Sequence, residues 1–165
     1  MREALHRWNS LSEEEAISEM LEQCGSRAWA TAMARARPIS DSRLFLETSH
    51  AAWTGLAEED RREALAAHPR IGDRSAVGEP AREQASVARA SKETREALAR
   101  ANREYEKRFG GVFLVCATGK TAEEILALCR QRLHNDPETE RRVAADEQRK
   151  IMRLRLERWL GELRP

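Results

Sequence analysis

Helix boundary signals recur along this chain and constrain its fold more than any other feature. Ser12 with Glu15, and Thr121 with Glu124, each match the pattern of a capping box, in which two side chains satisfy the first amides of a helix. Glycines follow the predicted helix ends, at Gly25, Gly55 and Gly110. Ala, Leu, Glu and Arg dominate the composition, which also favours helix over sheet. The sequence therefore predicts an all-α fold.

The apolar spacing between these signals divides the chain into elements. We predict helices over about residues 12–24, 26–37, 40–55, 58–67, 81–109, 121–135 and 136–163, the fifth with or without a break around Ser91. Residues 70–80 are predicted to form a loop. Val112–Ala117 is apolar but has no evident partner strand, so we predict a short buried extended segment near 112–117. The whole chain, residues 1–165, is predicted to be a single-domain multi-helix bundle.

Charge and cysteine content limit the classes of function. The 29 Lys and Arg residues nearly cancel the 28 Asp and Glu residues, so we expect no nucleic-acid partner. No apolar run approaches the roughly 20 residues that span a bilayer, and residues 1–11 lack a secretory leader pattern, so we expect no membrane association. Three widely spaced cysteines fit a reducing cytoplasm, and no metal-ligand spacing occurs, so we expect no metal.

His68 is the first candidate functional residue. It lies at a predicted helix end, because Pro69 disfavours the helical conformation in the residue before it. A helix end followed by a loop can project a side chain into a site, and a helix C-terminus stabilises an imidazolium ion. The alternative is that His68 only satisfies the terminal carbonyls of its own helix. Spacing alone favours this structural alternative.

Arg155 is the second candidate. On a helical wheel it lies between Ile151 and Trp159, inside the apolar face of the last predicted helix. A guanidinium in that position needs an anion or several acceptors, since burying it unpaired is costly. The partner is either a protein carboxylate, in a buried ion pair, or a carboxylate or oxyanion of a substrate.

Glu83 and Gln84 form the third candidate. They lie early in the helix that follows the loop after His68. An early carboxylate commonly caps helix amides. If the loop folds back, Glu83 can instead face His68 and form a general acid–base unit with it.

These residues belong to longer stretches that together resemble the OHCU (2-oxo-4-hydroxy-4-carboxy-5-ureidoimidazoline) decarboxylase family. The stretches are His-Pro-Arg-Ile-Gly-Asp at 68–73, Glu83-Gln84, Phe109–Lys120 and Arg132–Asn135. Cys24-Gly25-Ser26 with Trp29 and Met33 is similar to the family's N-terminal signature, and Glu147-Gln148 with Leu154-Arg155-Leu156 resembles its last helix. The likeness covers nearly the whole chain in order.

The resemblance implies an all-α homodimer that uses no cofactor. It also implies a small-molecule substrate, OHCU, which is converted to (S)-allantoin and CO2 in urate breakdown. The catalytic positions of the family match His68, Glu83 and Arg155. The implied substrate-binding positions are Pro69, Gln84, Val115, Cys116 and Ala117, the last three through backbone groups.

One stretch departs from the family pattern. Glu79 and Pro80 stand where the family often has a tryptophan and a serine, and the loop before them looks shortened. A hydroxyl contact to substrate is therefore missing or comes from Ser75 or Ser86. Two alternatives stay open: a related ureide or hydantoin decarboxylase or lyase, and a non-catalytic helical binding module in which Arg155 is an ion pair and His68 a cap.

Overall fold

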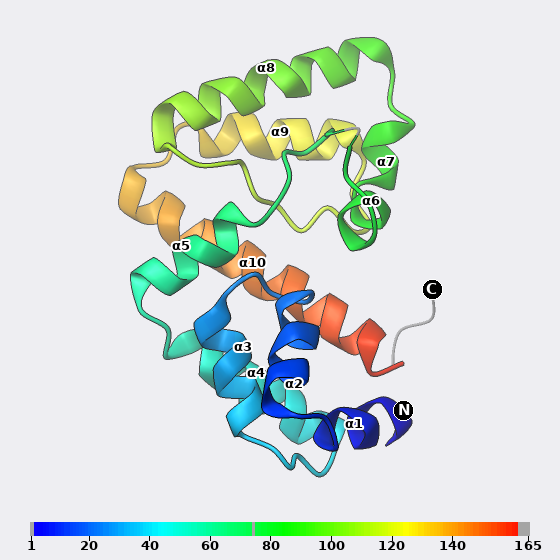
Figure 1. Ribbon diagram of the computed structural model, residues 1–165. Helices are drawn as coiled ribbons and strands as arrows, with labels where there is room; N and C mark the ends of the chain where they lie inside the picture. The colour runs from blue at the N-terminus through cyan, green and yellow to red at the C-terminus, as the bar shows by residue number, and fades with distance from the viewer. Residues whose placement is uncertain (1, 74, 162–165) are drawn as a thin grey trace. The chain divides into compact units, whose positions relative to one another are not determined.

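The computed structural model describes residues 2–73 and 75–161, in which helices are joined by loops and one extended segment (Figure 1). The helices are α1 (Arg2–Asn9), α2 (Glu13–Leu21), α3 (Arg27–Arg35), α4 (Ser42–Thr54), α5 (Glu58–Ala66), α6 (Glu79–Glu83), α7 (Ala85–Ala88), α8 (Lys92–Phe109), α9 (Ala122–Arg132) and α10 (Pro137–Trp159). No strand occurs in these two ranges, which confirms the all-α prediction. Backbone contacts cluster in unit 1, from residues 1–64 and 149–165, and unit 2, from residues 65–148.

Side-chain caps fix where the helices begin. Both predicted capping boxes are present: Ser12 and Glu15 bond each other's backbone amides at 3.3 and 2.9 Å, and Thr121 and Glu124 do so at 3.1 and 2.7 Å. The last helix is capped by a side chain as well. Asp136 accepts hydrogen bonds from the amides at 138 and 139. These local interactions satisfy helix amides without tertiary contacts, which explains why the sequence pattern located them.

The core of unit 1 is built from aromatic and sulfur-containing side chains. The rings of Trp8 and Phe45 meet edge to face at 5.3 Å, and Phe45 stacks on Trp159 at 5.2 Å. Met20 and Met33 are fully buried in the same unit. The indole N–H groups of Trp8 and Trp29 donate to backbone carbonyls, and that of Trp159 donates to the carboxylate of Glu19 at 2.8 Å.

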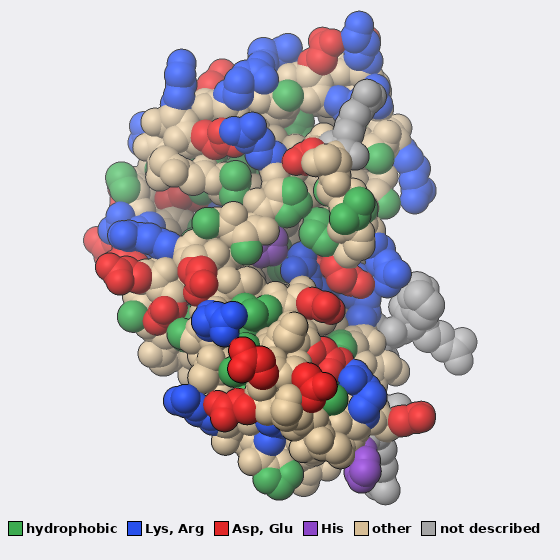
Figure 2. Space-filling model, viewed as in Figure 1, with side chains coloured by type: hydrophobic (Ala, Val, Ile, Leu, Met, Phe, Trp, Pro, Cys, Tyr) green, Lys and Arg blue, Asp and Glu red, His purple; other side chains and the backbone are tan. Residues whose placement is uncertain are grey.

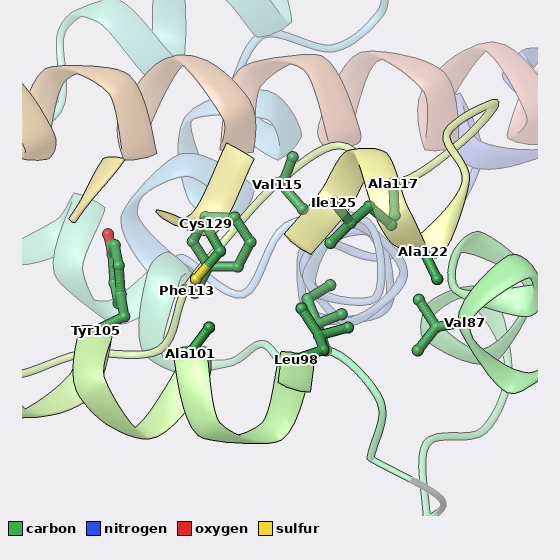
Figure 3. Packing of buried hydrophobic residues seen from close by; sticks show 11 residues of the cluster. Val87, Leu98, Ala101, Tyr105, Phe113, Val115, Ala117, Ala122, Ile125 and Cys129 are labelled. Carbon is green, nitrogen blue, oxygen red and sulfur yellow. The ribbon is translucent and has the colours of Figure 1, made fainter. Parts of the chain in front are cut away.

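The core of unit 2 forms where α8 and α9 lie side by side (Figure 1). Side chains from both helices meet those of the apolar segment, as Figure 3 shows for Leu98, Ile125 and Phe113. Residues 113–117 are all buried and have no helical or strand assignment, so the predicted buried extended segment is confirmed. α8 ends at Gly110, whose φ of 76° suits a residue without Cβ.

The sequence missed the first helix and one helix break. α1 was not predicted, although Leu5 and Trp8 bury one of its faces. The helix after the loop begins at Glu79 rather than Ala81. It is also interrupted at Gln84, whose backbone leaves the helical region, in addition to the break near Ser91. Tertiary packing of short segments decides these details, and propensity carries little information about them.

The last helix is shorter than predicted. It ends at Trp159, and Gly161 follows with a φ of 74°, a left-handed conformation that stops the helix. Leu163, predicted to extend its apolar face, lies outside the described residues.

The outer surface is strongly charged but mixed in sign. Figure 2 shows acidic and basic side chains interspersed on the face in view. Within the described ranges, every helix is too short or too polar to cross a membrane.

Candidate active site

The predicted helix end at His68 is confirmed in unit 2. α5 ends at Ala66, and the amide of His68 still donates to the carbonyl of Leu65 at 3.4 Å. His68 and Pro69 are both half-buried. The imidazole therefore projects from the last turn of a helix at the start of a loop.

Three contacts hold the loop that follows His68. Arg70 makes two hydrogen bonds to Glu106 of α8, at 2.5 and 2.8 Å. The buried amide of Asn102, also in α8, donates to the carbonyl of Ile71 at 2.9 Å. The amide of Gly72 donates to the side-chain oxygen of Gln84 at 2.8 Å. This anchoring fixes the backbone immediately after His68.

The bond from Gly72 also orients Gln84. Because the side-chain oxygen of Gln84 accepts that bond, its NH2 group is the part directed elsewhere. The break between α6 and α7 falls at Gln84, whose backbone is outside the helical conformation. Gln84 can therefore offer donors, and its neighbour Glu83 acceptors, from the same turn.

Charged side chains hold the extended segment 113–117. Arg132 donates to the carbonyl of Leu114 at 2.6 Å, and Glu147 accepts from the amide of Cys116 at 2.7 Å. Lys120 donates through Nζ to the carbonyl of Cys116 at 2.9 Å. The sequence reasoning assigned no role to these three charged residues. The signal that could have found them is the segment itself, since buried backbone without a partner strand must find other partners.

Burial and nearby charges shift the pKa of the Cys116 thiol. Burial raises its pKa, Lys120 lowers it, and the carboxylates of Glu147 and Glu83 raise it further. Glu83 and Cys116, two of the predicted site residues, both belong to unit 2. A thiol with a raised pKa is protonated at neutral pH and is a poor nucleophile.

Arg155 occupies the apolar face of α10, in unit 1, as predicted. It is only 6 % exposed, and Ile151 and Leu156 beside it are also buried, whereas Arg153 is exposed. A guanidinium this deeply buried requires anionic or carbonyl partners.

The structure describes Pro80 and the two serines, Ser75 and Ser86, that could supply a hydroxyl contact in its place. Pro80 lies in the first turn of α6 and provides none. The Ser75 hydroxyl donates to Asp73 at 2.7 Å. The hydroxyl oxygen of Ser86 is buried and has no hydrogen-bond partner within the described chain. The same part of the chain holds no group of three or more His, Cys, Asp or Glu side chains placed for a metal.

Known proteins resemble this chain along most of its length. A family model described as OHCU decarboxylase matches residues 9–157. The uric acid degradation bifunctional protein TTL of Arabidopsis thaliana is 31 % identical over 144 residues, which cover 81 % of this chain and 44 % of that protein. The chain thus spans less than half the length of that relative. A 2-oxo-4-hydroxy-4-carboxy-5-ureidoimidazoline decarboxylase of Haloferax volcanii is 29 % identical, covering 96 % of this chain and 97 % of that protein.

Solved structures give the same result. A crystal structure of OHCU decarboxylase in the presence of (S)-allantoin matches with a TM-score of 0.79 and 32 % identity, over 87 % of this chain and 97 % of that one. A structure of (S)-allantoin synthase shares the fold, with a TM-score of 0.72 at 19 % identity, over 94 % of this chain and 53 % of that one. With the family model spanning residues 9–157, the chain belongs to the OHCU decarboxylase family.

Proposed function

We propose that this protein decarboxylates OHCU to (S)-allantoin and CO2 in urate degradation. The observation that carries the proposal is the similarity to a solved OHCU decarboxylase over 97 % of that chain. The match of the family model to residues 9–157 includes residues of both units. It supports our expectation that residues 1–165 act as one functional domain.

The substrate itself makes a cofactor-free reaction chemically reasonable. OHCU carries a carboxylate and a hydroxyl on one ring carbon, beside a ring C=N bond. When the bond to the carboxylate breaks, its electron pair enters the ring and is delocalised across the C=N bond. The nitrogen of the former C=N bond takes up a proton. The hydroxyl then loses its proton as its oxygen becomes the product carbonyl, and a proton is added to the ureido-bearing carbon, so one proton is taken up in total. The protein must orient the carboxylate, stabilise the charge and select one face for the proton.

We assign proton chemistry to His68. Its imidazole interacts with the substrate hydroxyl and carboxylate and helps to start CO2 loss, and Glu83 orients the imidazole and the hydroxyl or ureido group. The half-buried position of His68 at a helix end and its anchored loop support this role.

Backbone and amide groups of unit 2 supply the polar contacts in our proposal. Gln84 donates from its NH2 group, because Gly72 occupies its oxygen. In the segment Val115–Ala117, the amide of Cys116 is engaged by Glu147, so the oxyanion contact is assigned to the amides on either side of it. Pro69 is assigned to pack against the ring of the substrate, beside His68.

Arg155 is assigned to bind the carboxylate or a ring oxygen. Its buried guanidinium is suited to a planar anion, because the cost of burying the charge is offset only by close anionic or carbonyl acceptors. An Arg155→Lys variant keeps the charge but loses the fork of donors, so we expect it to raise KM more than it alters stability.

The decisive assay generates OHCU in situ from urate with two upstream enzymes. We expect this protein to accelerate OHCU loss and to yield only dextrorotatory (S)-allantoin. Decay at the spontaneous rate, with racemic allantoin, would contradict the proposed function. Activity after exhaustive dialysis against a chelator tests the expectation that no metal is needed.

Variants test the residue roles. His68→Asn should lower kcat by about 10²- to 10⁴-fold, the usual contribution of a general acid or base, and leave the circular dichroism spectrum unchanged. His134→Asn is a matched control, because that side chain is exposed at the end of α9. Full activity in His68→Asn would refute the assignment.

The departure at Pro80 supports a second candidate substrate, a related ureide or hydantoin acid. Pro80 removes a hydroxyl position, and the buried Ser86 hydroxyl is the available replacement. Comparing kcat/KM for OHCU with that for close ring analogues, in wild type and Ser86→Ala, separates the two substrates. If Ser86→Ala lowers kcat/KM for only one of the two substrates, that substrate is the one that contacts Ser86.

We also propose that the protein is a homodimer and that it is cytoplasmic. The family resemblance supports a homodimer, which light scattering of the purified protein tests directly. All three cysteines are buried, in keeping with the proposed cytoplasmic location.

A further inference from the structure

The extended segment 113–117 has one edge occupied by charged side chains. In extended backbone, the polar groups of alternate residues point to opposite edges. The carbonyl of Leu114 and both polar groups of Cys116 share one edge, and Arg132, Glu147 and Lys120 bind them at 2.6–2.9 Å. That edge is therefore closed to a ligand. On the opposite edge the carbonyl of Ala117 accepts from the amide of Lys120 at 3.0 Å, so a ligand that meets this backbone must reach the groups of Val115 or the amide of Ala117.

Two side chains of opposite charge bind the backbone of a single residue, Cys116. The carboxylate of Glu147 takes the amide hydrogen of Cys116, and the ammonium of Lys120 reaches its carbonyl. Both are charge-assisted hydrogen bonds, which are shorter and stronger than neutral ones. Together they fix the rotation of the segment about its own axis, in place of the ladder that a neighbouring strand would provide.

We propose that Glu147 and Lys120 are positioning residues, which hold the Cys116 backbone so that the Val115 edge faces the ligand. The inference rests on the proposed function, because it takes the segment to contact substrate. It concerns two side chains that act through the backbone and not through contact with the reacting atoms. The carboxylate of Glu147 is needed as a hydrogen-bond acceptor at a defined place, and its charge is of secondary importance.

Conservative and disruptive variants separate this role from general stability. Glu147→Gln keeps an acceptor oxygen, whereas Glu147→Ala removes it. We expect Glu147→Ala to lower kcat/KM for OHCU about tenfold to a hundredfold, as a misplaced binding group does, and Glu147→Gln to stay within a few-fold of wild type. Glu138→Ala is the matched control, because its side chain is exposed in the first turn of the same helix. Lys120→Met should resemble Glu147→Ala in direction with a smaller loss.

An NMR readout is independent of turnover. In ¹⁵N-labelled protein, the amide proton of Cys116 should resonate downfield and exchange slowly with solvent. Both properties should be lost in Glu147→Ala, while amides within α8 and α9 keep their protection. Titration with (S)-allantoin should shift the Val115 amide in wild type and shift it less in Glu147→Ala.

The outcomes discriminate between the two proposals. An unprotected Cys116 amide in wild type would overturn the inference, as would full kcat/KM in Glu147→Ala. Equal losses in Glu147→Gln and Glu147→Ala, with the Cys116 amide still protected in the Gln variant, would show that charge matters and position does not. If wild type fails to turn over OHCU while Cys116 remains protected, the proposed function fails and the hydrogen bond stands. If Glu147→Ala does not fold, Lys120→Met and Glu147→Gln carry the test.

Discussion

The two units of this protein bury different kinds of core. Unit 1 packs Trp8, Phe45 and Trp159 against one another, and its fully buried indoles, those of Trp8 and Trp29, donate to backbone carbonyls. Unit 2 buries an ion pair: the side chains of Arg132 and Glu140 are 7 % and 3 % exposed and lie 2.5 Å apart. The same guanidinium stacks over Phe113, 4.7 Å from the ring centre.

The difference follows from the backbone that each core contains. Helices satisfy their own amides and carbonyls, so apolar contact makes up most of the core of unit 1, and Arg155 is its buried charged residue. Unit 2 contains an extended segment without a sheet, and its backbone groups turn to side chains. Arg132 serves the carbonyl of Leu114 and needs Glu140 to balance its charge. A charged core therefore marks the place where irregular backbone is held, and the candidate substrate contacts lie on that backbone.

The largest expected effect comes from Glu140→Gln. The carboxylate accepts from Arg132, Tyr105 and Asn135, and an amide cannot accept from all three because one of its ends is a donor. Leaving Arg132 unbalanced should lower the free energy of unfolding by about 3–5 kcal/mol. Urea denaturation measures this loss in the free energy of unfolding, and Glu138→Gln, at an exposed position, is the control. A loss below about 1 kcal/mol would mean that the charged core of unit 2 is dispensable.

Cys129 tests whether the core of unit 2 excludes an additional charge. Burial raises the pKa of this thiol to about 11 from its ordinary value of 9.0. The unfolded chain therefore loses the proton first as pH rises, so the stability from the neutral buried thiol is complete below pH 9 and is lost towards pH 11. By linkage the loss at pH 11 is about 2 kcal/mol.

The comparison for Cys129 is the variant Cys129→Val, which has a similar volume and cannot ionise. Its urea midpoint should fall less than that of wild type between pH 9 and pH 11. Identical pH profiles would show that another group causes the alkaline loss of stability.

A smaller effect is expected from a volume-conserving change in unit 1. Met33 is fully buried among apolar neighbours, so Met33→Leu should cost less than about 1.5 kcal/mol. This variant is the apolar counterpart of Glu140→Gln, since both nearly preserve shape. If the two substitutions cost the same in urea denaturation, the contrast between the cores is wrong.

The smallest effect should come from an exposed ion pair. Arg43 and Glu47 lie one helical turn apart at 3.2 Å, with side chains 82 % and 56 % exposed. Solvent screens such pairs, so Arg43→Ala should leave the denaturation midpoint unchanged within error at physiological salt. A midpoint shift as large as that of Glu140→Gln would show that burial does not explain why the two ion pairs differ in their effect on stability.

Much of the candidate site was predictable because its signals are local. The helix end at His68 follows from Pro69, and the burial of Arg155 follows from its register among apolar residues. The break between helices near Ser91 follows from its capping pattern. In each case, neighbours within a few residues carry the information.

The sequence by itself determined most of the helices, several of their caps, the buried extended segment and the family. Only the tertiary structure decided what satisfies that segment. Glu147 lies 31 residues from Cys116, and Arg132 lies 18 residues from Leu114, so no local pattern could pair them. The pairing arises because a buried amide or carbonyl needs a partner, and in an all-α unit without strands that partner is whichever polar side chain the packing of α9 and α10 brings within reach.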